Sequence, residues 1–210
     1  MFSDASLPEP AVTAEIENPP RFCAVSESDG VFFNAQFTND RRLRAYTYRQ
    51  LLQAKARLPA GVVLMVFEGY RPLSAQKKLW DDIMLKMRAA HPALAPDSEE
   101  LMALCNRFVA NPYRQGSGHQ SGAAVDVALC DSDGRLLDMG GAVRGFEDTA
   151  AFDCPALSET AKANRRVLKE AMASAGFVNY PAEWWHYSFG DRLWAKLTGS
   201  PIAIFGQVDL

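Results

Sequence analysis

The chain has 210 residues, 48% of them hydrophobic, which is enough to bury one sizeable core. Its 22 Lys and Arg and 25 Asp and Glu give a formal net charge of -3, with no basic stripe along the chain. Nucleic acid is therefore excluded as an expected partner, because a phosphate backbone is bound by clustered positive charge.

The N-terminal region differs in composition from the rest of the chain. Residues 1–21 are acidic and rich in proline, so we expect an extended arm there and one domain over residues 22–210. The first twenty residues contain no Lys or Arg and no long apolar run, unlike a secretory signal. No later segment approaches the roughly 20 apolar residues that cross a bilayer. We therefore expect a cytoplasmic protein that does not associate with membranes.

The cysteines give no sign of a metal or redox site. Cys23, Cys105, Cys130 and Cys154 stand far apart and form no C-x-x-C pair. In a reducing compartment we expect them to be free thiols.

Helices and strands in the first half of the chain are predicted from the spacing of apolar residues. Apolar positions at helical spacing predict helices, and a short continuous apolar run predicts a buried strand. In chain order these are a helix over Tyr48–Leu58, a strand over Val62–Phe67, a helix from a Ser74 cap to about Ala90, and a helix from Asp97 or Ser98 to Val109.

The second half of the chain begins with a glycine-rich loop over residues 115–122, followed by a strand over Ala123–Leu129. A long irregular segment covers residues 135–155. A helix then runs from a Ser158 cap to Ala175, and the aromatic segment Phe177–Phe189 has strand character. This irregular order of helices and strands favours an α+β fold over a doubly wound sheet.

Two of the three histidines stand in unusual surroundings. His119 lies in the glycine-rich loop, and Asp126 follows on the predicted strand. Side chains alternate between the faces of a strand, so Asp126 shares its face with two small residues, Ala124 and Ala128. The opposite face, with Val125, Val127 and Leu129, is expected to be core. The space above Asp126 would suit a metal ion and a substrate.

The other histidine of interest is His186, in the tetrapeptide Glu183-Trp-Trp-His186. Strand parity would place Glu183 and His186 on opposite faces, so they can share a site only if Glu183 belongs to the turn before the strand. Two imidazoles and a carboxylate form a typical catalytic zinc set that leaves a position open for water. We therefore predict zinc on His119, Asp126 and His186, with Glu183 as general base.

Arg71 follows the predicted strand Val62–Phe67 and has two possible roles. It could be a turn arginine paired with Glu68, or a fixed cation that stabilises the oxyanion of a tetrahedral intermediate. The third histidine, His91, is expected to lie on the surface.

Three motifs carry a resemblance to the D-alanyl-D-alanine dipeptidases. Residues 117–126 match the pattern S-x-H-x-x-G-x-A-x-D, residues 183–186 match E-x-W-H, and residues 69–72 resemble the arginine motif of that family. The resemblance implies a small α+β fold shared with zinc D-Ala-D-Ala peptidases and the hedgehog signalling domain, with a short antiparallel sheet flanked by helices. It also implies one zinc ion per chain, transition-state stabilisation by Arg71, and a substrate contact from Ser117.

The chain departs from the family pattern in one segment. The family has Met-Gly followed closely by Phe-Asp, whose carboxylate recognises the substrate ammonium. In this chain Met139-Gly140 is separated from Phe152-Asp153, so Asp153 is the predicted ammonium ligand, with Phe146-Glu147 as the alternative.

Together these features predict a zinc metallopeptidase that cleaves a small dipeptide, D-Ala-D-Ala, in the metabolism of peptidoglycan. Two other functions remain open. One is a D,D- or L,D-carboxypeptidase that trims peptidoglycan stem peptides. The other is a zinc-stabilised binding module without turnover, although such a module would need neither Glu183 nor Arg71.

Overall fold

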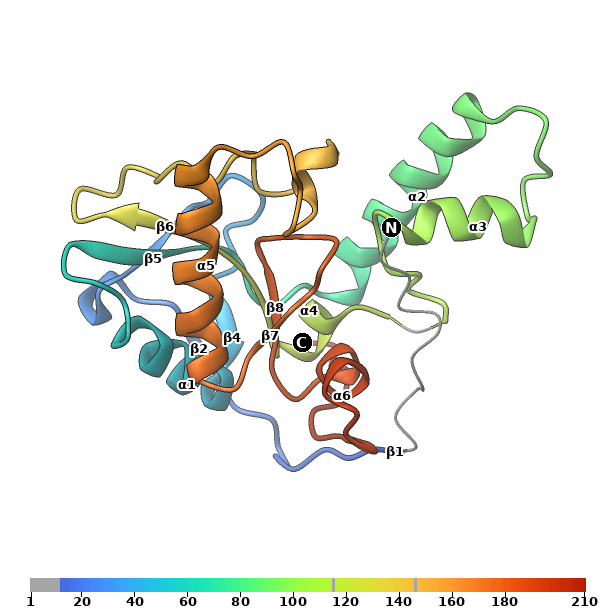
Figure 1. The fold of residues 1–210 in the computed structure, drawn as a ribbon. Helices are drawn as coiled ribbons and strands as arrows, with labels where there is room; N and C mark the ends of the chain where they lie inside the picture. Colours follow the sequence, from blue (N-terminus) through green and yellow to red (C-terminus); the bar gives the residue numbers. More distant parts are fainter. Residues whose placement is uncertain (1–11, 115, 146) are drawn as a thin grey trace.

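A five-stranded sheet forms the centre of the computed structural model, which describes residues 12–114, 116–145 and 147–210 (Figure 1). Its strands lie in the order β3-β5-β6-β8-β7. They are β3 (Val31–Phe33), β5 (Val62–Glu68), β6 (Ala124–Asp131), β8 (His186–Ser188) and β7 (Val178–Asn179). Helices and this sheet together make the predicted α+β fold.

The sheet is mixed, whereas we expected an antiparallel one. Three neighbouring pairs, β5–β6, β6–β8 and β7–β8, are antiparallel, and β3 pairs with β5 in parallel. Parallel neighbours need a crossover connection. Here the chain between β3 and β5 passes through β4 (Arg42–Arg44) and helix α1 (Ala45–Lys55), which provide it.

The helices agree with the predicted segments, with shifted ends. Ser98 and Ser158 cap their helices as predicted, accepting hydrogen bonds from the backbone N–H of Leu101 and Ala161. The predicted cap at Ser74 is wrong, because α2 (Leu73–Ala90) begins directly after Pro72 and already includes Ser74.

The remaining helices are α3 (Glu99–Asn106), α4 (Gly118–Ser121), α5 (Glu159–Ser174) and α6 (Arg192–Thr198), with 3-10 turns η2 (Glu27–Asp29) and η3 (Asp148–Ala150).

The described part of the N-terminal arm lies against the domain; residues 1–11 are outside the described part. Strand β1 (Val12–Thr13) pairs with β9 (Ile202–Ala203), and β2 (Phe22–Ala24) pairs with β4. The fully buried Arg44 forms ion pairs with Glu15 and Glu17 at 2.6 and 3.3 Å. It also donates to the carbonyls of Ser121 and Gly206, so one side chain joins the arm, α4 and the C-terminal segment.

Helices α2 and α3 project from the rest of the molecule as a pair, as Figure 1 shows. They have a small hydrophobic cluster of their own around Trp80, Ile83 and Cys105, separate from the main core. The main core joins the sheet to α1 and α5 through residues such as Leu51 and Leu168. His91, at the tip of α2, is exposed as expected.

All four cysteines are free, as predicted. In the described ranges, no helix combines the length and the apolar character that a membrane span requires.

Arg165 of α5 binds the backbone of the irregular segment 138–153. Its side chain is 1% exposed and donates to four backbone carbonyls of that segment. The acceptors are Met139, Thr149, Ala151 and Phe152, at 2.7, 2.7, 2.7 and 3.2 Å. The guanidinium also lies 5.3 Å from the ring centroid of Trp184. One buried cation thus supplies four of the hydrogen bonds that hold the described part of this segment.

We predict that Arg165→Met destabilises the protein by about 3 kcal/mol or more, because buried carbonyls lose their hydrogen-bond partners. Denaturant unfolding monitored by Trp fluorescence measures the change. Arg166→Met, at the exposed neighbouring position, is the matched control and should shift the free energy of unfolding by about 0.5 kcal/mol or less. Equal effects of the two substitutions would contradict the role given to Arg165.

Candidate metal centre

The register of three adjacent strands brings three ionisable side chains together. Asp126 on β6 is paired with His186 on β8 and with Glu68 on β5. Directly paired residues of antiparallel strands point to the same face of the sheet. Glu68, Asp126 and His186 therefore form a row across the sheet.

A β-bulge places Glu68 in this row. The β5–β6 pairing runs regularly up to Val66 and Val127 and then shifts by one residue, so that Glu68 is paired with Asp126. Without this shift, Phe67 would take that position. Bulges commonly redirect side chains next to functional sites, and this one exchanges an aromatic ring for a carboxylate.

His119 reaches the row from the short helix α4. Ser117 caps this helix by accepting a hydrogen bond from the backbone N–H of His119, and Gly122 ends it in a left-handed conformation, with φ 70°. The Nδ1 atom of His119 lies 2.8 Å from the carbonyl oxygen of Gly69. A carbonyl oxygen can only accept, so Nδ1 carries a proton in this contact, and Nε2 is the nitrogen that faces Asp126.

The side chains of His119, Asp126 and His186 fit a divalent metal ion. One potential ligand atom from each of these three buried residues lies within 4.8 Å of the others. Asp126 Oδ1 is 3.2 Å from His119 Nε2 and 3.1 Å from His186 Nδ1. The other nitrogen of His186 lies 3.3 Å from Ser188 Oγ. Each imidazole thus has an outer partner on the nitrogen that faces away from Asp126, as metal-bound histidines usually do.

Burial and mutual charge shift the pKa values of these groups in different directions. Burial lowers the pKa of His119. Burial alone would raise the pKa of Asp126, but the charge of His119 and hydrogen bonds from both imidazoles outweigh it and lower the pKa well below its usual range. Burial would likewise lower the pKa of His186, but the hydrogen bond to Asp126 and the charges of Asp126, Glu183 and Asp191 together outweigh it and raise the pKa. The aspartate therefore stays ionised and ready to bind a cation.

Glu183 lies in the turn before β8, as strand parity required. Its backbone N–H donates to Tyr180, and its carbonyl accepts from Asn179 and from the backbone of His186. Among the described residues, its carboxylate forms no hydrogen bond or ion pair, although the charges of His186, Asp126, His119 and Arg71 act on it. Burial raises the pKa of this carboxyl group. A free carboxylate next to a metal-ligand set is what a general base requires.

Arg71 is buried beside the row, and the structure shows the pairing with Glu68 that the sequence left open. Its guanidinium binds both carboxylate oxygens of Glu68, with Nε at 3.0 Å from Oε1, and Nη1 donates to Gln76 Oε1 at 2.7 Å. These three bonds use three of its five N–H groups. Pairing with Glu68 therefore fixes the cation while leaving donors available, so the two roles considered for Arg71 are compatible.

A second arginine, Arg144, lies in the site, and sequence reasoning missed it. Its guanidinium forms an ion pair with Glu68, its Nε lies 3.3 Å from Asp126 Oδ2, and it covers the ring of Phe37 at 4.6 Å. Burial lowers the pKa of Arg144 to about 10, and the group remains charged at neutral pH. Arg144 sits in an irregular segment without periodicity, so no pattern in the sequence pointed to it.

The predicted substrate ligands are less well placed than the metal ligands. Ser117 is buried and caps α4, next to His119. Asp153 is exposed and forms no hydrogen bond or ion pair with the described residues of the row. Glu147 is exposed too, and its predicted neighbour Phe146 lies outside the described residues. The segment 138–153 thus brings a cation, Arg144, to the site, whereas we expected an acid.

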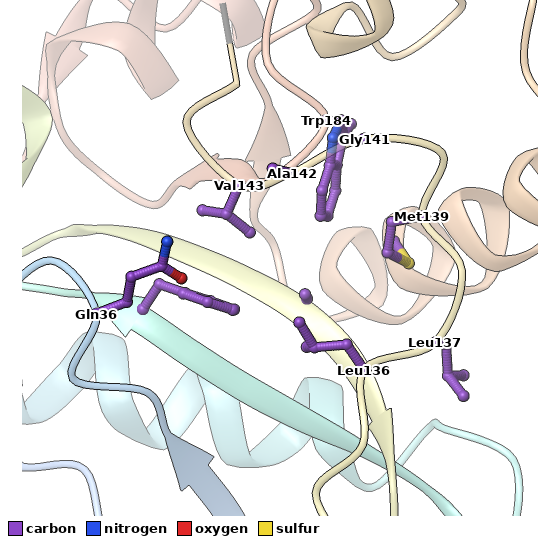
Figure 2. Close-up of a pocket in the computed structure, with 10 residues that line it drawn as sticks. Gln36, Leu136, Leu137, Met139, Gly141, Ala142, Val143 and Trp184 are labelled. Carbon is purple, nitrogen blue, oxygen red and sulfur yellow. The ribbon is translucent and has the colours of Figure 1, made fainter.

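A small apolar cavity adjoins the row along β6. It measures about 100 Å³ and lies between the strands and the segment that carries Arg144, with Val143, Met139 and Trp184 around it (Figure 2). Ala128, which shares the face of Asp126, forms part of its wall. None of the three metal ligands lines the cavity, so the open space lies farther along this face of β6 than the position above Asp126 that we predicted.

Three buried ligands of this kind, together with an unpaired glutamate, define the class of metallopeptidases. The family model described as D-ala-D-ala dipeptidase matches residues 43–201, which include every member of the row. The chain belongs to this family.

Two similar sequences agree with this assignment, and one solved structure shows a weaker likeness. A D-alanyl-D-alanine dipeptidase of Synechocystis is 30% identical over 182 residues, covering 73% of this chain and 71% of that protein. The D-alanyl-D-alanine dipeptidase of Escherichia coli is 29% identical over 128 residues, covering 61% and 55%. A solved structure of VanYB in complex with D-Alanine-D-Alanine aligns with a TM-score of 0.46 and 24% identity, over 73% of this chain and 75% of that one.

We predict that Asp126→Asn lowers zinc affinity by more than about a hundredfold, because removing an anionic ligand should cost more than the loss of an outer partner. Competition with a chromophoric chelator measures the dissociation constant. Asp131→Asn, at the solvent-facing end of the same strand, is the control and should keep the parental affinity. Unchanged zinc binding by the Asp126 variant would show that this set does not hold the metal.

Proposed function

We propose that the protein is a zinc peptidase that hydrolyses a small D,D-dipeptide such as D-Ala-D-Ala, with one zinc ion per chain on His119, Asp126 and His186. The observation that carries this proposal is the free carboxylate of Glu183 beside the three ligands. A purely structural zinc site is normally closed by four protein ligands and has no use for such a group. A non-catalytic binding module is therefore disfavoured.

Zinc, when bound, supplies Lewis-acid chemistry, polarising a carbonyl group and making water a better nucleophile at neutral pH. The protein keeps the ligands oriented through Gly69, which holds His119, and Ser188, which contacts His186. Such outer contacts fix the tautomer and the direction of each ring. The role of these two residues is thus to position the ligands.

Glu183 is proposed to move the proton. Its carboxylate accepts a proton from the attacking water and returns it to the leaving amine, which is general base followed by general acid catalysis. Its backbone is held at three points in the turn before β8, so the carboxylate stays beside the ligands. The upward pKa shift that burial causes suits a group that must accept and then release a proton near neutral pH.

Arg71 is proposed to stabilise the negative charge that develops on the scissile carbonyl oxygen. Glu68 and Gln76 fix its guanidinium from two sides, so little reorganisation is needed when charge develops. Two N–H groups are not used in these bonds and can serve as donors to the oxyanion. Ser117, beside His119, is proposed to contact the substrate.

A second candidate is a carboxypeptidase that acts on longer peptidoglycan peptides. One observation favours it: in the described residues of the segment 138–153, no acidic side chain contacts the row where a free substrate ammonium was expected to bind. Rates on free D-Ala-D-Ala and on a pentapeptide that ends in D-Ala-D-Ala separate the two. The dipeptidase proposal requires the faster kcat/KM on the free dipeptide.

We predict that Glu183→Gln lowers kcat by about a hundredfold or more while zinc content stays at one ion per chain, because a base is lost and no ligand. Metal analysis and D-alanine release, measured on the same preparation, check both parts. Glu170→Gln, an exposed position on α5, should keep the parental rate. Full activity of the zinc-loaded Glu183 variant would refute the assignment.

A further inference from the structure

The irregular segment 138–153 contributes the guanidinium of Arg144 to the metal centre. Arg144 makes contact with Glu68 and Asp126, and its side chain is 20% exposed. It therefore lies at the boundary between the buried row and solvent. Arg165 donates to the carbonyls of Met139 and Thr149, which lie on either side of Arg144 in the sequence. These hydrogen bonds fix the backbone that carries the guanidinium of Arg144.

The acids that face Arg144 also have other partners. Glu68 is shared between two arginines, because Arg71 binds the same carboxylate. Asp126 directs its Oδ1 toward both imidazoles and its Oδ2 toward Arg144, and the charge of Glu183 acts on Arg144 as well. Because each contacting acid is shared with another cation or an imidazole, the guanidinium of Arg144 keeps the capacity to bind a further carboxylate.

Arg144 also has free donors. Its Nη1 makes no hydrogen bond or ion pair with the residues that the structure describes, whereas Nε and Nη2 face the two acids. The planar fork of a guanidinium matches a carboxylate well. In addition, Arg144 is the one described non-glycine residue with a positive φ, 58°. Unfavourable backbone geometry at a functional site suggests that the side chain is needed there.

From this geometry we propose that Arg144 binds a carboxylate of the substrate and disfavours substrates that present an ammonium group at this point. The inference rests on the proposed peptidase function and specifies its substrate class. Two sources of the carboxylate share this chemistry: the free C-terminus of the peptide and an acidic side chain.

Kinetics with three substrates test the inference. They are D-Ala-D-Ala, its C-terminal amide, and the amide of D-Glu-D-Ala, in which only the side chain carries a carboxylate. Arg144→Gln should lower kcat/KM by about ten- to a hundredfold on the substrate whose carboxylate it binds, and by less than about threefold on the D-Ala-D-Ala amide, which has no carboxylate. Which of the two carboxylate-bearing substrates responds identifies the source.

The matched control is Arg135→Gln, which removes the same charge from an exposed arginine that pairs with Asp133. It should leave all three rates unchanged. An equal loss by Arg144→Gln on the substrates with and without a carboxylate would assign Arg144 a merely structural role beside Asp126 and overturn the inference. So would a parent enzyme that does not distinguish the carboxylate substrates from the D-Ala-D-Ala amide.

A binding experiment separates failure of this inference from failure of the proposed function. The zinc-loaded Glu183→Gln protein is titrated calorimetrically with the same three compounds, with and without Arg144→Gln. A preference for a carboxylate that Arg144→Gln abolishes supports the inference even if the parent protein hydrolyses none of them. Absence of binding, or a preference that survives Arg144→Gln, overturns it even if hydrolysis occurs.

Discussion

The site depends on the pairing of Asp126 with His186 across β6 and β8. This register sets a carboxylate beside an imidazole without any contribution from a loop. A slip by one residue would turn either side chain to the opposite face of the sheet, so the site and the core are specified by the same pairing. The bulge on β5 adds Glu68 to the row, and α4 closes it with His119. Strands thus position Glu68 and two of the three metal ligands, and α4 positions the third.

Charge compensation is the second requirement of this arrangement. Buried carboxylates are tolerated only where cations or hydrogen bonds offset the loss of water. Glu68 meets this condition through Arg71 and Arg144, and Asp126 through two imidazoles and Arg144. Glu183 differs, since its carboxylate has no direct partner among the described residues, and burial raises its pKa although the charges of His186, His119 and Arg71 oppose the shift. This acid without a direct partner is the one to which we assign a changing protonation state.

Much of the site could be predicted because its residues belong to local patterns. Because side chains alternate between the two faces of a strand, Glu183 and His186 could share a site only if Glu183 lay in the turn before β8. The same alternation along β6 placed Asp126 on the face opposite Val125, Val127 and Leu129. The β-bulge before Glu68 could not be predicted, because nothing in the apolar run marks where pairing shifts. The parallel pairing of β3 and the position of Arg144 also depend on contacts distant in sequence. The role of Asp153 stays a prediction, since the side chain is exposed and the irregular segment has no periodicity that indicates which side chains point inward.

The left-handed backbone at Arg144 has a consequence for the evolution of this protein. Glycine adopts that conformation at lower cost, but it would remove the ion pairs of Arg144 with Glu68 and Asp126 and would raise the entropy of the unfolded chain. The backbone at this position therefore favours glycine, whereas the two buried carboxylates favour a cation. Substitutions tolerated at position 144 should accordingly be few.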